Sequence, residues 1–174
     1  MPIIAKAGGG SFAPAPAGTH SAVCCDVVDL GVLEVNYAGK TKRQHKITVI
    51  WQIGERRDDD KLFLLRKRYT LSLHEKASLR KDLESWRGRS FTPAELEGFD
   101  IETLLGVPCL LSVIHQAKDG DIFANISAIM RLPKGMEALK VVDYVRVCDR
   151  EPTQAEPTQP QWGGMEITDD DVPF

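Results

Sequence analysis

Positively charged side chains gather in the middle of the sequence, where they could bind a polyanion. Residues 40–90 contain 15 Lys and Arg against 7 Asp and Glu, a local surplus of eight positive charges. Such an excess attracts a phosphate backbone without reading its bases. The candidates for phosphate contact lie in or beside two predicted strands and are Lys40, Lys42, Arg43, Lys46, Arg66 and Arg68.

Three aromatic residues could supply rings on which nucleobases stack. Tyr37 lies in the turn signal Asn36–Gly39 and is the ring least committed to a core. Trp51 and Tyr69 share strand parity with aliphatic residues, so packing in the core is the default for both. Because they lie in the same two predicted strands as the cations, both remain candidates for base stacking.

The end of the chain has the opposite charge. Residues 149–174 hold seven acidic residues and one base, Arg150, with almost no core formers, so we expect a disordered acidic tail. In its last residues, three aspartates would attract a basic partner over a distance, and a proline would stiffen the chain. The final phenylalanine offers an aromatic ring and a free carboxylate, which suit an apolar pocket with a basic rim. The expected partner-binding residues are Asp169, Asp170, Asp171, Val172, Pro173 and Phe174.

No pattern in the sequence indicates catalysis, a metal site or a cofactor. The three consecutive aspartates Asp58–Asp60 would diverge on an extended chain. The four cysteines show no Cys-x-x-Cys spacing, and the four histidines are scattered. A phosphate-binding glycine loop and a nucleophile elbow are both missing. A hydrophobic content of 43% with 27% charged residues is typical of a globular protein. Since residues 1–18 do not resemble a signal peptide, we expect a cytoplasmic protein.

Periodicity predicts strands, then a helical insert, then further strands. Alternating residues favour a strand over 44–54, and the period changes to that of a helix over 75–87. Thr92 opens a capping box and Asp119-Gly120 is a hairpin turn. An apolar stretch at 139–148 could add a strand, cover the edge of a barrel or pair with a second subunit. The expected strands are 18–35, 44–54, 62–73, 107–116 and 122–130, with helices at 75–87, from 93 and over 101–105.

Three strands, helices and two more strands is the element order of the five-stranded OB-fold barrel. The expected fold class is therefore all-β with a helical insert between strands 3 and 4. The expected organisation is a flexible N-terminal arm over 1–17, an OB-fold domain over 18–148 and the acidic tail over 149–174.

The chain also resembles a known family. Its ending, Asp169-Asp170-Asp171-Val172-Pro173-Phe174, is similar to the acidic tip of bacterial and phage single-stranded-DNA-binding proteins. The body resembles the phage- and prophage-associated branch in the stretches 28–31, 69–74, 83–89 with 91–92, and 98–106. The resemblance implies a protein that coats single strands in DNA replication, recombination and repair, and whose tip recruits partners and competes with DNA for the basic surface.

Two other functions fit the same residues. One is a replisome adaptor that keeps the barrel and the tip but has weak or no DNA affinity. The other, less favoured, is a metal-dependent nuclease that uses carboxylates of the body. Charge reversal at Lys46, Arg66 and Arg68 separates a DNA binder from an adaptor, because only the binder needs those cations. A magnesium-dependent cleavage assay tests for the nuclease.

Overall fold

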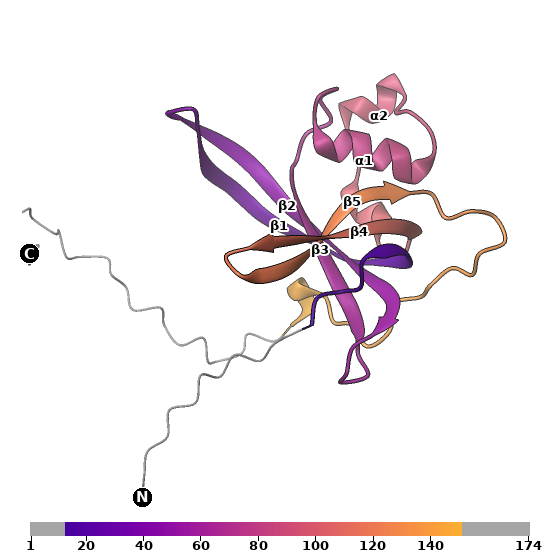
Figure 1. The fold of residues 1–174 in the computed structure, drawn as a ribbon. Helices are drawn as coiled ribbons and strands as arrows, with labels where there is room; N and C mark the ends of the chain where they lie inside the picture. The colour runs from indigo at the N-terminus through magenta and orange to yellow at the C-terminus, as the bar shows by residue number, and fades with distance from the viewer. Residues whose placement is uncertain (1–12, 151–174) are drawn as a thin grey trace, which may run out of the picture.

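A computed structural model describes residues 13–150, which form five antiparallel strands with helices between the third and the fourth (Figure 1). The predicted fold class, all-β with a helical insert, is confirmed at this level. The strands are β1 Gly18–Tyr37, β2 Lys40–Arg56, β3 Leu62–Thr70, β4 Pro108–Lys118 and β5 Asp121–Met130.

The sheet has the strand order β3-β2-β1-β4-β5, so β1 lies at its centre and pairs with both β2 and β4. The two outermost strands, β3 and β5, also contact each other. A sheet whose outer strands meet encloses one layer of side chains, since alternate residues of every strand point inward. The architecture is therefore barrel-like.

The core confirms the alternation predicted for β2. Ile47, Val49, Trp51 and Ile53 are all buried and face the interior. Trp51 is 1% exposed and Tyr69 on β3 is 2% exposed, and the rings of Trp51 and Trp86 lie 5.9 Å apart. The prediction that Trp51 and Tyr69 bind DNA is therefore wrong, because no face of either ring is open to a base.

The β1–β2 hairpin is longer than predicted and extends beyond the rest of the sheet (Figure 1). Its two-residue turn has positive φ angles at Ala38 (50°) and Gly39 (76°), the conformation that matches strand twist. Bulges interrupt the register of β1 between Cys24 and Asp26 and between Asp29 and Gly31. Gly31, with φ 70°, provides the left-handed residue that the second bulge needs.

The helical insert contains α1 (Ser78–Arg87), α2 (Pro93–Glu97) and the 3-10 helix η1 (Ile101–Leu104). Leu79, Leu83 and Trp86 of α1 are buried, which anchors the insert to the barrel. The capping box predicted at Thr92 is present: its side chain accepts from the backbone of Glu95, and the Glu95 carboxylate accepts from the backbone of Thr92.

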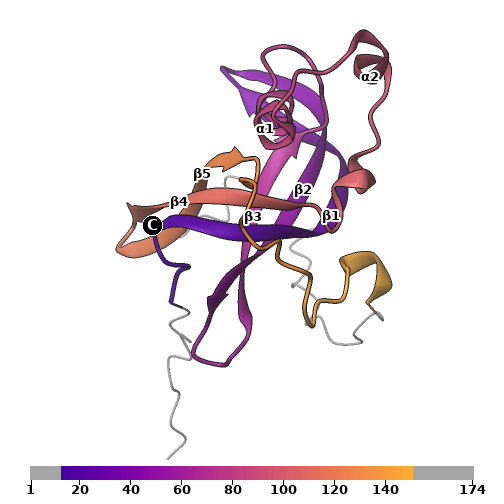
Figure 2. The ribbon, with the colours of Figure 1, turned by 90° about the vertical axis from the view of Figure 1, so that its right-hand side faces the viewer.

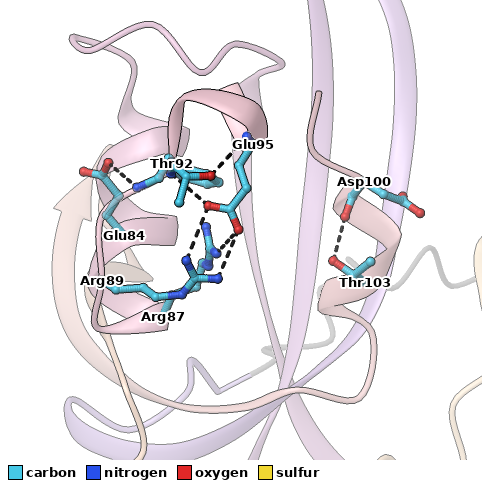
Figure 3. A network of polar contacts seen from close by, with 8 residues as sticks. Glu84, Arg87, Arg89, Thr92, Glu95, Asp100 and Thr103 are labelled. Carbon is cyan, nitrogen blue, oxygen red and sulfur yellow. Dashed lines mark hydrogen bonds and ion pairs between the residues drawn. The ribbon is translucent and has the colours of Figure 1, made fainter. Parts of the chain in front are cut away.

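The carboxylate of Glu95 on α2 also contacts the C-terminal end of α1 and the loop that follows it (Figure 3). It pairs with Arg87 at 2.5 Å and with Arg89 at 3.0 Å. The guanidinium of Arg87 in turn lies 4.5 Å from the ring centre of Phe91. Hydrogen bonds from the Thr92 backbone and from Arg87 lower the pKa of Glu95 from 4.5 to about 2.

Residues 139–150, hereafter the strap, run across the outer side of β1 and β2 (Figure 2). The strap contains the short 3-10 helix η2 (Val147–Asp149) and no strand, so the extra strand considered at 139–148 does not form. The Gln52 side chain donates to the carbonyl of Val142 at 2.7 Å and accepts from its N–H at 2.9 Å. The strap thus covers Gln52, which is buried although it points away from the barrel interior, as is Ile50 on the same side of β2.

At the other end of the chain, residues 13–17 also pack on the barrel. Ala15 is buried, and its carbonyl oxygen lies 2.7 Å from Nε2 of His115. For these residues the structure differs from the loose arm expected over 1–17, and residues 1–12 lie outside the described part. Within residues 13–150, no helix is long and apolar enough to cross a membrane.

Candidate functional site

The strand register brings most of the predicted cations to one face. Side chains two apart on a strand point the same way, so Lys40, Lys42 and Lys46 share one side of β2. On β3, Arg66 pairs with Ile50 and Arg68 with Thr48, which places both arginines on that same side. We call this outer side of β1, β2 and β3 the cationic face.

Tyr37 joins the cationic face from β1. It lies directly opposite Lys40 at the tip of the hairpin, and the residue is 75% exposed. Paired residues of neighbouring strands point to the same side, so the ring extends the row formed by Lys40 and Lys42. Its exposure leaves it open to stack on a base.

Arg43 does not belong to the cationic face. It has the parity of the core residues of β2 and so points to the opposite side of the hairpin. There Nε of Arg43 lies 3.8 Å from Oε1 of Glu34, its cross-strand partner. Of the predicted DNA contacts, Arg43 is thus separated from the other cations, and Trp51 and Tyr69 are inside the barrel.

The cationic face contains a hollow of about 410 Å³. Three arginines line it: Arg66 and Arg68 from β3, and Arg150 from the end of the strap. We call it the arginine hollow, and it combines positive charge with an apolar floor. The remaining lining residues are Val28, Leu30, Thr48, Ile50 and Val147.

A second concave surface lies between β3 and the β4–β5 hairpin, with a volume of about 1110 Å³. We call it the apolar groove, because Phe63, Ile122 and Phe123 contribute to its lining. Ile122 is 56% exposed and Phe123 is 49% exposed. Large apolar side chains left this open beside each other make the groove a candidate surface for ligand contact.

Arg66 lines both the arginine hollow and the apolar groove. The two concave surfaces therefore meet at β3, with positive charge on one side and apolar rings on the other. An extended chain with an anionic backbone and flat apolar bases could contact both in succession, its phosphates on the arginines and its bases in the groove.

Sequence reasoning missed Arg150 and the apolar groove. Arg150 was counted with the acidic tail, although it follows η2 and lines the arginine hollow. Phe63 shares strand parity with the buried Leu65 and Tyr69, and Phe123 lies within the predicted strand 122–130, so neither pattern indicates an exposed ring. The position of Phe123, three residues after Gly120 of the hairpin turn, was a usable signal, since a strand extending past the barrel leaves such a side chain uncovered.

The partner-binding tip predicted at 169–174 lies outside the described residues. Within residues 13–150, no three His, Cys, Asp or Glu side chains are grouped so that they could hold a metal ion. No protein-family model matches the chain, and no curated protein is similar enough to match it.

Proposed function

We propose that the protein is an OB-fold protein that binds single-stranded DNA with little sequence preference. The element order supports the fold, because a helix separates β3 from β4 and β1 pairs with both β2 and β4 in a barrel-like sheet. The observation that carries the function is the cationic face, where Tyr37 and five of the predicted cations share one surface.

The chemistry of the face favours an unpaired strand. Arginine and lysine side chains neutralise phosphates, and this contact is independent of sequence. Tyr37 and the apolar groove offer surfaces for bases, and bases can reach such surfaces only when they are not held in a duplex. In a cell, this binding would coat and protect single strands during replication and recombination.

A comparison of single-stranded and duplex DNA tests the proposal. Fluorescence anisotropy with labelled oligo-dT and with a duplex of equal length, both at moderate salt, gives the two affinities. We expect oligo-dT to bind at least about tenfold more tightly, because its bases are free to stack. Equal affinities would contradict the proposal, since a hairpin that enters the major groove of a duplex would then explain the cations as well.

We also propose that the tip, Asp169–Phe174, binds partner proteins of replication or recombination and competes with DNA for the cationic face. Residues 151–168 join the tip to Arg150, which lines the arginine hollow, and when extended they reach at most about 60 Å. Deleting residues 169–174 should keep or raise the affinity for oligo-dT, since a competing polyanion is removed. A loss of DNA binding on deletion would contradict this division of roles.

A further inference from the structure

The arginine hollow collects three cations whose charge no carboxylate of residues 13–150 neutralises. Elsewhere in the described chain, arginines such as Arg80, Arg87 and Arg146 pair with carboxylates. Cations that converge without a counter-charge repel one another, so an anion bound between them is stabilised. The hollow is therefore suited to an anionic ligand. Two of its arginines come from β3, and the third, Arg150, comes from the strap.

A buried carboxylate fastens the strap that carries Arg150. Asp26 is 1% exposed and accepts three hydrogen bonds from the strap: from the Tyr144 hydroxyl at 3.0 Å, Nε of Arg146 at 3.2 Å and the Val147 N–H at 2.8 Å. Burial alone would raise the pKa of Asp26, but these hydrogen bonds outweigh it and lower the pKa. The anchor is thus ionised at neutral pH.

Two contacts within the strap orient the side chain of Arg150. Nε of Arg150 donates to the carbonyl of Val145 at 3.1 Å, and its guanidinium lies 5.5 Å from the ring centre of Tyr144. Within residues 13–150, its two terminal nitrogens have no hydrogen-bond partner. Arg150 therefore presents the forked end of its guanidinium, the geometry that matches the oxygens of a phosphate.

We propose that the strap is part of the nucleic-acid interface and that Arg150 binds a backbone phosphate of the single strand together with Arg66 and Arg68. The inference rests on the proposed function and adds to it a contact outside the barrel strands. Val28 and Leu30 are half-buried and leave apolar surface in the floor of the hollow. This surface favours a nucleotide over a free inorganic ion, because a sugar or base can pack on it while its phosphate meets the arginines.

Full-length Arg150→Gln tests this assignment against Lys81→Gln, which removes the same charge from the exposed side of α1. Both variants and the wild type are titrated with labelled oligo-dT between about 50 and 300 mM salt. For Arg150→Gln we expect about three- to tenfold weaker binding and a log–log salt slope smaller in magnitude by about 0.7, the loss of one phosphate contact on a single strand. Lys81→Gln should stay within about twofold of the wild type.

The outcomes separate this inference from the function on which it rests. If the wild type binds oligo-dT and Arg150→Gln binds with the same affinity and slope, the strap is not part of the interface, while the proposed function stands. If the wild type binds no oligo-dT, the proposed function fails and the inference fails with it. Arg150→Lys keeps the charge without the fork, so an affinity between those of the wild type and Arg150→Gln supports the contact.

Discussion

The cationic face and the helical insert both contain arginines, but they differ in whether those arginines pair with carboxylates. In the insert, Arg80 pairs with Glu84, and both Arg87 and Arg89 pair with Glu95. On the cationic face, no carboxylate of residues 13–150 pairs with Arg66 or Arg68. Cations that pair with carboxylates of the same chain help to hold the fold together, whereas cations without such partners can bind an anionic ligand.

The charge surplus of residues 40–90 does not by itself show where a polyanion can bind. The surplus covers both regions, yet only part of it is open to solvent and unmatched. Lys67, for example, points to the core side of β3, and its ammonium lies 2.6 Å from the carboxylate of Asp82 on α1. The location of the partner carboxylates, and not the number of cations, decides where a polyanion can bind.

The largest expected effect comes from removing two unmatched cations. Arg66→Gln with Arg68→Gln should weaken binding to oligo-dT by about 20-fold or more at low salt and reduce the magnitude of the salt slope by about 1.4. Lys81→Gln with Arg89→Gln removes the same charge from the helical insert and should change the affinity less than about threefold. Anisotropy titrations give both values, and equal losses for the two pairs would erase the distinction between the regions.

A smaller effect is expected from the hairpin, where neighbouring residues point to opposite faces. Tyr37→Ala should weaken binding to oligo-dT by about five- to tenfold, because it removes one ring on which a base stacks. Arg43→Ala removes a cation that points to the other side and is already paired with Glu34, so the affinity should fall by less than about twofold. A larger loss of affinity for Arg43→Ala than for Tyr37→Ala would place the DNA on the side of the hairpin opposite the cationic face and contradict the account.

The smallest expected effect concerns stability in acid and belongs to the insert. Because the pKa of Glu95 is lowered from 4.5 to about 2, its ionised form stabilises the fold above pH 4.5. That contribution is lost as the pH falls from about 4.5 to about 2. Thermal unfolding of the wild type and of Glu95→Gln should therefore differ most at neutral pH and converge towards pH 2.5. A constant difference over this range would show that Glu95 does not act through its charge.

Local signals predicted much of the fold. The alternation of Ile47, Val49, Trp51 and Ile53 identified a core-facing strand, because apolar side chains on one side must be buried together. The Thr92 capping box and the Asp119-Gly120 turn appear where they were expected, since each depends on only a few neighbouring residues.

Features that depend on distant residues could not be predicted in this way. The hairpin extends to Lys40 because the backbone pairs with Val35–Tyr37, although the side chains there show no buried face. The strap is held by Asp26, which is 121 positions before Val147, so no local pattern in 139–150 indicates where it packs. The candidate site was likewise predicted only in part: parity placed Arg66 and Arg68 on the outer side of β3, while the position of Arg150 depends on how the strap packs.

Lysine footprinting of the complex tests most directly whether DNA lies on the cationic face. The wild-type protein is acetylated with and without saturating oligo-dT, and the modification of each lysine is read by mass spectrometry. We expect DNA to protect Lys40, Lys42 and Lys46 and to leave Lys81 of α1 modified as in the free protein. Equal modification of the three face lysines with and without DNA, or protection of Lys81 instead, would contradict the account.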